Sequence, residues 1–326
     1  MKRYIAKRLL LIIPMLIGIS FIMFTVMHLA PGDTASIKYG MNPEVSGSAR
    51  ANFDKMYDLD KPVLVQYGLW VKRLISLDFG SSLIDDQAVM AKITSRLPAT
   101  LLLQIISLFI IFLIAVPIGV ISAVKRNSFF DRIMTIFVFI GYATPSFWLA
   151  LLLILFFGFK LGWLPISGMS PWYTAYLDSF DRTKDLIAHL VLPVVATAFG
   201  SLAALSRYSR SSVIEVMNEN YVLTARAKGL SSSRIVTAHI LKNALLSIIT
   251  IMGLSLPALI SGSFIFETIF AWPGMGRLGY EAIMNYDYPV VMGVGVIATF
   301  LTLIGIFLSD IAYAFVDPRI RVGGEK

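Results

Sequence analysis

Six apolar runs, each long enough to cross a bilayer, set the strongest limit on what this chain can fold into. A membrane helix needs about 20 predominantly apolar residues to span the hydrocarbon core. The runs are continuously apolar, without the alternation of a membrane barrel strand. The sequence therefore predicts an all-α membrane protein with six transmembrane helices, near Leu9–Met27, Thr100–Val124, Ile133–Phe157, Leu186–Ser206, Asn243–Phe266 and Val290–Val316.

The composition agrees with a membrane protein and argues against several other classes. Of the 326 residues, 57% are hydrophobic and only 15% are charged, whereas soluble domains carry roughly 25% charged residues. The chain has no cysteine and three histidines. We therefore expect no disulfide framework, no metal site and no cysteine nucleophile.

The first apolar run follows a basic segment, as a signal peptide would. Its length of about 19 residues exceeds the 7–15 residues of a signal-peptide core. No cleavage site with two small residues closes it, because Met27 is followed by His-Leu-Ala-Pro-Gly. We expect this run to be retained as the first membrane helix.

The distribution of basic residues predicts the orientation of the chain. With the N-terminus in the cytoplasm, residues 1–8, 125–132, 207–242 and 317–326 are cytoplasmic, and they hold 16 Lys and Arg residues against five acidic residues. The remaining hydrophilic segments hold 12 Lys and Arg residues against 13 acidic residues. The net charge of +8 thus indicates topology and lipid contact rather than nucleic-acid binding. We expect a multi-pass protein of the cytoplasmic (inner) membrane with both termini cytoplasmic.

Three regions follow from this topology: residues 1–29 form a cytoplasmic tail and the first span, residues 30–98 a small extracytoplasmic domain, and residues 99–326 a five-helix core. In the outer domain, the apolar spacing from Asp60 to Leu74 predicts a helix with Pro62 in its first turn. Ala88–Ile93 predicts a second, short helix. Such a cap could dock a delivered ligand or partner, or it could only shield the helix bundle.

The cytoplasmic loop 207–242 is too regular for a simple linker. Ser211–Ala227 has apolar residues at helical spacing, and Gly229 is a residue type typical of the position just after a helix C-terminus. Ser231, Ser232 and Ser233 can cap a second helix over Arg234–Leu246. We predict a helix–glycine–helix elbow on the cytoplasmic face.

The elbow is suited to contact another protein. The small side chains of Ala225 and Ala227 would allow close approach of a partner's groove, and Arg226 and Lys228 would provide charges at its rim. A solvated basic loop that only connects two spans is the alternative, and the spacing does not decide between them.

The elbow resembles the EAA loop of bacterial ATP-binding-cassette (ABC) importer permeases. Ala225, Gly229 and Leu241 match the general pattern, and Thr224-Ala-Arg-Ala-Lys-Gly-Leu230 with His239-Ile-Leu-Lys-Asn243 is similar to the peptide/nickel variant. Further segments extend the resemblance over nearly the whole chain: Leu29-Ala-Pro-Gly-Asp33, Leu97-Pro-Ala-Thr100, Trp272-Pro-Gly-Met-Gly276 and Asp317-Pro-Arg-Ile320. The chain is identified as a bacterial or archaeal permease of the dipeptide, oligopeptide and nickel family, resembling its B-type (first) subunit.

The resemblance implies a type I ABC importer permease fold and half of a translocation pathway for di- or oligopeptides or a related small solute. Its implied partners are a second homologous permease subunit, two cytoplasmic ATP-binding subunits that carry ATP and Mg, an extracytoplasmic substrate-binding protein and membrane lipid. Contact with the ATPases would involve Tyr221, Thr224, Ala225, Arg226, Ala227, Lys228, Gly229 and His239. The choice among dipeptides, oligopeptides, nickel chelates and oligosaccharides stays open, as does pairing with a second copy instead of a homologue.

The sequence contains no phosphate-binding loop of the Gly-x-x-x-x-Gly-Lys-Ser/Thr type and no Gly-Lys dipeptide at all. If ATP drives transport, another chain hydrolyses it. We therefore expect this chain not to be an enzyme, to hold no cofactor of its own and to contain no catalytic residue.

Three residues are candidates for the translocation pathway: Glu267, Pro145 and Gly262. Glu267 could recognise a peptide amino terminus, but the sequence favours a structural role instead, as an ion-pair partner of Arg277 or at a helix N-terminus. Pro145 would kink its helix. The small residues of Gly141–Pro145 and Gly253–Gly262 favour either a pathway lining or close helix packing.

Two rival functions remain as alternatives. An ion-coupled secondary transporter would need coupling carboxylates near the middle of the membrane, and the spans carry few ionisable groups there. Asp310 lies near the inner end of the sixth span, where it could pair with Arg207 or Arg210. A membrane scaffold that transports nothing is compatible with both the elbow and the outer domain.

Overall fold

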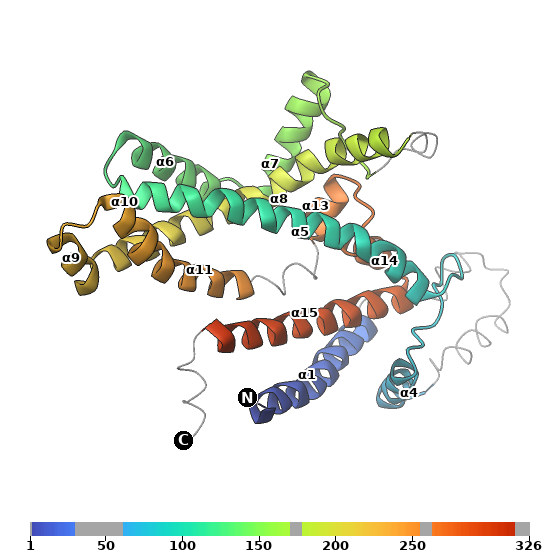
Figure 1. The fold of residues 1–326 in the computed structure, drawn as a ribbon. Coiled ribbons are helices and arrows are strands. Elements are labelled where there is room, and N and C mark those ends of the chain that lie inside the picture. Colours follow the sequence, from blue (N-terminus) through green and yellow to red (C-terminus); the bar gives the residue numbers. More distant parts are fainter. Residues whose placement is uncertain (1, 30–60, 170–177, 255–262, 317–326) are drawn as a thin grey trace. The chain divides into compact units, whose positions relative to one another are not determined.

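The computed structural model describes residues 2–29, 61–169, 178–254 and 263–316 (Figure 1). These residues are mostly helical, and none of them lies in a β-strand. The chain divides into two compact units. The first comprises Met1–Thr100, Ser261–Phe264 and Pro273–Ile304, and the second comprises Leu101–Ile260, Ile265–Trp272 and Gly305–Lys326. Helices α5 (Val89–Val124) and α15 (Tyr288–Val316) contribute residues to both units.

Four helices in the described part of the chain are long and apolar enough to cross a membrane. They are Arg8–Leu29 within α1 (Lys2–Leu29), α5, α8 (Ser179–Met217) and Tyr288–Ile311 within α15. They correspond to the first, second, fourth and sixth predicted spans. The fifth predicted span includes residues 255–262, which lie outside the described residues. Its described ends are α11 (Lys242–Leu254) and α13 (Phe264–Ile269).

The third predicted span is not a single straight helix. Helix α6 (Phe129–Ala143) ends before Pro145, and α7 (Ser146–Leu153) continues as the π-helix η1 (Ile154–Lys160) at 102° to α6. The residue before a proline is driven out of the helical region by the proline ring, and Thr144 is extended, with ψ 119°. The pair can form one broken span, so the described helices provide four or up to five spans.

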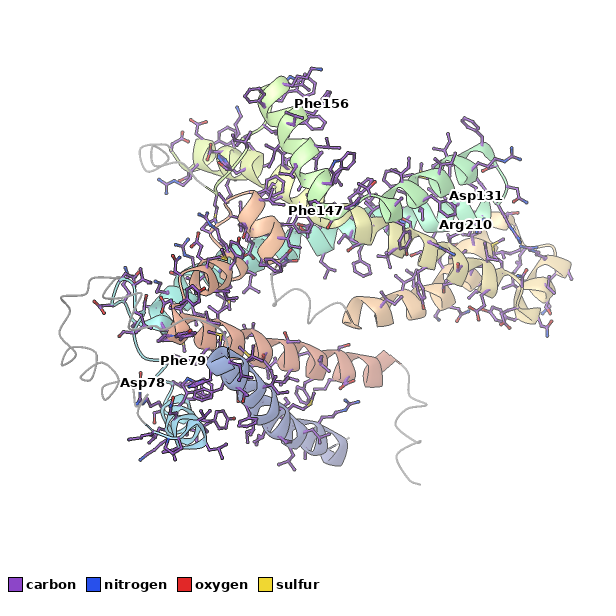
Figure 2. All side chains as sticks on the ribbon, turned by 180° about the vertical axis from the view of Figure 1, so that it is seen from behind. Asp78, Phe79, Asp131, Phe147, Phe156 and Arg210 are labelled. Carbon is purple, nitrogen blue, oxygen red and sulfur yellow. The ribbon has the colours of Figure 1, made fainter. Side chains whose placement is uncertain are left out.

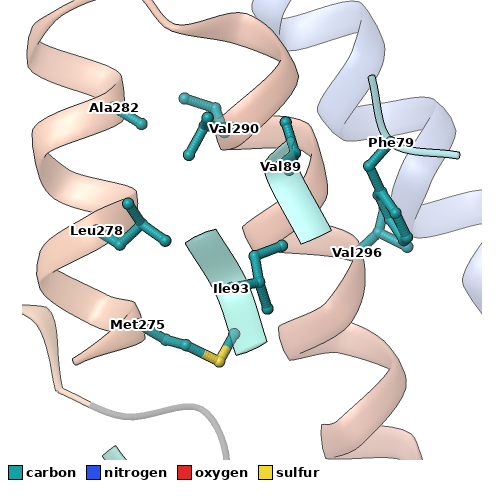
Figure 3. Close-up of a cluster of buried hydrophobic side chains, with 9 residues drawn as sticks. Phe79, Val89, Ile93, Met275, Leu278, Ala282, Val290 and Val296 are labelled. Carbon is teal, nitrogen blue, oxygen red and sulfur yellow. The ribbon is translucent and has the colours of Figure 1, made fainter. Parts of the chain in front are cut away.

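The core of the first unit gathers at the N-terminal end of α5 (Figure 3). Val89 and Ile93 of α5 pack against α14 (Met275–Met284) and α15, together with Phe79 from the preceding loop. Thr100 lies further along α5, and its Oγ1 accepts a 2.7 Å hydrogen bond from Met275 N. This bond satisfies one of the backbone donors that the start of α14 leaves without an intrahelical partner.

A buried carboxylate fixes the loop that precedes α5. Asp287 is 2% exposed and accepts hydrogen bonds from Ser82 Oγ and from Leu83 N. Lys92 contacts the same loop through a 2.8 Å bond to Asp85. The short helix expected at Ala88–Ile93 is therefore not separate, because Val89 already begins the 36-residue α5. The helix expected near Asp60–Leu74 is present as α4 (Val63–Ile75), with Pro62 at its N-cap.

In the second unit, α5 and α6 pack closely on α8 at glycines. A Cβ placed on Gly119 would lie 2.5 Å from Ser209 Cβ, and one on Gly141 would lie 2.6 Å from Ala203 Cβ. Neither distance is possible for real atoms. Small residues thus permit the close approach of helix backbones that is common in membrane proteins. At Gly141, the described structure agrees with the close-packing alternative.

Candidate functional site

The loop 207–242, predicted to be cytoplasmic, folds into an elbow of short helices. Helix α8 ends at Met217, with Asn218 as its C-cap. Helix α9 (Asn220–Ala227) begins two residues after Asn218. Asn218 N and Glu219 N donate to carbonyls three residues back, which tightens the last turn of α8. The single helix expected over Ser211–Ala227 is therefore interrupted at residues 218–219.

Gly229 ends α9 as the sequence predicts. Its φ is +75°, a left-handed conformation that favours glycine. Gly229 N donates to Arg226 O, and Leu230 N donates to Ala225 O. These two bonds define a Schellman motif, in which the residue after the glycine also packs back on the helix. Leu230 does so, packing against the buried cluster beneath α9.

After the elbow, the chain turns back through a returning helix of mixed type. Helix α10 (Ser232–Arg234) is followed by the π-helix η3 (Ile235–Leu241) and then by α11. Ser231 occupies the predicted N-cap position, but its hydroxyl makes no capping hydrogen bond. The α-helix expected over Arg234–Leu246 is thus partly π-helical. Short π segments within helices are frequent at functional sites.

The elbow packs tightly on its own unit, and this corrects the expectation that Ala225 faces a partner protein. Ala225 is 5% exposed and lies in a buried cluster formed by α5, α8, α9, η3 and α11: Ala123, Val213, Val222, Ala225, Ile235, Ile240 and Ala244. Its small side chain therefore allows close packing within the chain. Spacing alone does not show which side of a short helix faces its own core. Ala227, the other small residue, is exposed.

The outer side of the elbow presents most of the predicted contact residues together. Tyr221, Thr224, Arg226, Ala227 and Lys228 are all exposed on α9 or at its C-cap. Leu223, which sequence reasoning did not include, is 50% exposed beside them. A leucine within a basic, polar stretch was the signal that could have identified it. This side of α9 offers a mixed apolar and basic surface.

Two contacts connect α9 to the returning helix. Asn243 Nδ2 donates 2.9 Å hydrogen bonds to Tyr221 Oη and to the carbonyl of His239. His239 itself is half-buried on η3. The structure therefore places Tyr221 and His239 around one asparagine, although they are 18 positions apart.

A buried ion pair lies in the same unit and joins α6 to α8 (Figure 2). Arg210 Nε and Nη2 donate to the two carboxylate oxygens of Asp131, at 2.8 and 2.9 Å. Asp131 also accepts a bond from Asn127 N. The sequence suggested Asp310 as the partner of Arg210 or Arg207; for Arg210, the structure shows Asp131 instead.

A cavity of about 200 Å³ adjoins this ion pair. Its walls come from α5, α6 and α8, and most of them are apolar: Ile118, Gly119, Ser122, Met134, Thr135, Val138, Phe139, Ser206, Arg207 and Arg210. The cavity is small, and its polar groups are the two arginines and a few hydroxyls. It is an interhelical cavity between α5, α6 and α8.

The pathway candidates lie in different environments. Pro145 is exposed at the bend between α6 and α7, and Phe147, two residues further along the chain, is also exposed (Figure 2). Glu267 is completely buried in the first turn of α13, and its carbonyl accepts a 2.8 Å bond from Trp272 N. Gly262 lies outside the described residues. Among those described, no group of three or more His, Asp or Glu side chains is placed to hold a metal ion.

Several long apolar helices, with a packed elbow between two of the hydrophobic segments, are the features of a multi-pass membrane protein. Comparison with known proteins agrees with this class and narrows it. A model of the binding-protein-dependent transport system inner membrane component matches residues 115–322, and a model of the N-terminal part of such components matches residues 1–104. The chain therefore belongs to the family of inner membrane components of binding-protein-dependent transport systems.

Relatives of known name match over their full length. The oligopeptide transport system permease protein AppB of Bacillus subtilis is 41% identical over 322 residues, which cover 98% of this chain and 100% of AppB. The dipeptide transport system permease protein DppB of Alkalihalophilus pseudofirmus is 38% identical, and the match covers 98% of this chain and 100% of that protein. The di/tripeptide transport system permease protein DppB of Pseudomonas aeruginosa is 37% identical, and the match covers 98% of this chain and 99% of that protein.

A solved structure shows the same fold. A chain in the inward-facing MetNI methionine ABC transporter superposes with a TM-score of 0.56 and 22% identity, covering 70% of this chain and 97% of that chain. The likeness supports the type I ABC importer permease fold expected from the sequence. The predicted family is confirmed, and so is the prediction of a transport permease that is not itself the ATPase. The comparisons do not support the ion-coupled or scaffold alternatives.

Proposed function

We propose that this chain is the membrane permease subunit of an ATP-driven importer for short peptides. The observation that carries the proposal is the 41% identity to an oligopeptide permease protein along the whole of both chains. Other relatives are named for dipeptides or for di- and tripeptides, which favours peptides over nickel chelates and oligosaccharides. The chain would form half of the translocation pathway.

The proposed ATPase contact is the outer side of the elbow. Exposed residues of α9 supply it: Tyr221, Thr224, Arg226, Ala227 and Lys228, now joined by Leu223. Ala225 and Gly229 act differently, since Ala225 seats α9 on its own core and Gly229 sets the turn. His239 supports the returning helix, where its carbonyl accepts from Asn243. ATP and Mg would be held by the partner ATPases.

The proposed topology has six spans with both termini in the cytoplasm. It rests on the excess of Lys and Arg in the four segments assigned to the inside. Residues 1–29 would hold the first span, 30–98 the extracytoplasmic domain and 99–326 the five-helix core. The complex would add a second homologous permease, two ATPases and an external binding protein. Glu267, Pro145 and Gly262 remain the candidates for the pathway.

The test compares two glycines that have the same geometry but different places in the chain. Gly229 and Gly80 have φ values of +75° and +74°, and a Cβ on either would meet nothing within 4 Å. Valine at either position therefore adds a similar conformational cost, about 1–2 kcal/mol, without a clash. Gly80 precedes α5, far from the elbow in the sequence.

The experiment is copurification of the complex from native membranes in mild detergent. We expect Gly229→Val to insert normally and to lose the ATPase subunits, whereas Gly80→Val keeps them. Equal loss of ATPases in both variants would show that the elbow has no special role in coupling. A wild-type chain that never copurifies with an ATPase would overturn the importer function itself.

A further inference from the structure

The exposed side of α4 carries large apolar side chains as well as Lys72 and Arg73, whereas Trp70 and Leu74 pack on the core of the unit. Its polar Gln66 is 9% exposed and faces the rest of the unit, whereas Leu64 is 70% exposed and Ile75 is 79% exposed. A water-exposed helix gains free energy by burying such apolar side chains. Helices in lipid show the opposite arrangement, because lipid tails are as apolar as leucine.

The buried side of α4 is joined to α1 by polar contacts. Tyr67 Oη donates to Ile17 O at 3.0 Å and lies 3.0 Å from Ser20 Oγ. Gln66 Oε1 bonds with His28 Nε2 at 2.8 Å. Gln66 Nε2 donates to Lys61 O. The polar groups of this interface therefore find partners inside the protein, as an environment without water requires.

The contact of Tyr67 with Ile17 lies deep along α1, whereas the Gln66–His28 contact lies at the C-terminal end of α1. Ile17 precedes Leu29, the end of the apolar span Arg8–Leu29, by 12 residues. At 1.5 Å per residue, this distance is about 18 Å, and the hydrocarbon core is about 30 Å thick. Ile17 therefore lies near the middle of the membrane, and it does so whichever end of α1 faces the cytoplasm.

Aromatic side chains fix α4 at this depth. Tyr67 packs edge-on against Phe21 and Phe24 of α1, with ring centroids 5.2 and 5.5 Å apart. Trp70 lies 6.2 Å from the ring of Phe24 and also contacts the core of the unit. Lys72 and Arg73, in the last turn, have side chains long enough to reach lipid headgroups.

We propose that α4 is a membrane-embedded helix whose apolar side, formed by Leu64, Val65 and Ile75, contacts lipid acyl chains. This side would continue the lipid-facing surface of α1, where Ile22 and Val26 are 62% and 58% exposed. The segment expected to begin a water-exposed cap would instead anchor the first unit in the bilayer. The inference goes beyond the proposed transport function and does not depend on it, but it changes the proposed topology, because α4 would leave the extracytoplasmic domain assigned to residues 30–98.

The absence of cysteine from the sequence allows a direct test. The full chain carries one new cysteine at a time: Leu64→Cys on α4, Val65→Cys as a second α4 site, Ile13→Cys as a lipid reference and Gln87→Cys as a water reference. Ile13 is 56% exposed within the apolar span of α1. Gln87 is exposed in the loop before α5. Leu64 makes little contact with the core, so its replacement should not disturb folding.

The variants are reconstituted in phosphatidylcholine–phosphatidylglycerol vesicles. Their reaction with a membrane-impermeant maleimide and the quenching of an attached fluorophore by lipids with a nitroxide on the acyl chain are then measured. We expect the α4 cysteines to react at least about tenfold more slowly than Cys at position 87, because an apolar environment suppresses the reactive thiolate. Their fluorophores should be quenched as strongly as the one at position 13.

Two outcomes would overturn the proposal. Rapid labelling of both α4 sites, at the rate of position 87, would place α4 in water. Slow labelling without quenching by the nitroxide lipid would show that protein, and not lipid, covers this side of α4.

Discussion

Arg210 donates two parallel hydrogen bonds to Asp131, from Nε at 2.8 Å and from Nη2 at 2.9 Å. The carboxylate side chain is 5% exposed and the guanidinium 30% exposed. Such bidentate pairs combine charge with fixed geometry. The pair joins α6 to α8, the helix that leads into the elbow.

Removing one member of this pair should destabilise the protein. We expect Asp131→Asn to cost about 1–3 kcal/mol, less than a fully buried pair, because the remaining Arg210 keeps some access to water. Thermal unfolding in detergent measures the loss. Arg210→Lys should also lose stability, since lysine cannot form the bidentate pair. If the double variant Asp131→Asn/Arg210→Gln loses the sum of the losses measured for Asp131→Asn and for Arg210→Gln alone, the residues are not coupled.

The close contact of α5 with α8 predicts opposite effects for two glycine replacements. Gly119→Ala should destabilise by about 1–3 kcal/mol, because its Cβ would overlap Ser209 Cβ and helices must separate to accept it. Gly200→Ala, within α8 and with nothing within 4 Å of the new Cβ, should stabilise by up to about 1 kcal/mol through helix propensity. The melting temperatures of both variants are compared with that of the wild type. Similar shifts for the two variants would contradict the proposed packing.

The hydroxyl of Thr100 should be needed at the start of α14. Thr100→Val keeps the shape but removes the acceptor for Met275 N, which leaves a buried donor without this partner and should cost about 1–3 kcal/mol. Thr100→Ser is the matched control, because it keeps the hydroxyl and loses one methyl. Denaturation of the two variants separates the roles: a serine variant as unstable as the valine variant would assign the effect to packing.

The Lys92–Asp85 pair predicts a pH dependence. The hydrogen bond from Lys92 holds the pKa of Asp85 below its ordinary value of 3.8, against the opposing effect of burial. A carboxylate with a lowered folded pKa stabilises the fold above its ordinary pKa and loses this contribution as the pH falls through the folded value. Since Asp85 is largely exposed, the contribution should be at most about 1 kcal/mol.

Comparison of wild type with Asp85→Asn isolates this contribution. The difference in unfolding free energy should be constant near neutral pH and should shrink below about pH 4. A difference that persists unchanged to pH 2.5 would show that the ionised form of Asp85 is not what stabilises the loop.

Sequence patterns predicted the long spans better than the breaks between helices. Apolar length was enough to predict α1, α5, α8 and α15, because hydropathy reports directly on the solvent around a helix. The kink expected at Pro145 is confirmed, because α6 and α7 separate there at 102°, but proline does not break every helix, since α8 continues through Pro193. Whether a helix breaks at proline depends on the neighbours that satisfy its backbone.

For the candidate site, local rules predicted Gly229 correctly and tertiary contacts decided the rest. A glycine after a run of helix formers has few other roles, and its φ of +75° agrees. Ala225 was assigned to a partner but lies in the chain's own core. The partner of Arg210 is 79 positions away, a distance at which spacing carries no information. The π-helical form of η3 left no pattern that we recognised.

The way α9 is seated has a mechanical consequence. Only Asn218 and Glu219 separate α9 from α8, and five helical segments share the cluster beneath it. A force on α9 therefore acts on several helical segments through their shared packing contacts. The two-residue connection to α8 leaves α9 little freedom to move on its own. We therefore expect a displacement of α9 to be passed to α8 and to the other helices that share the buried cluster.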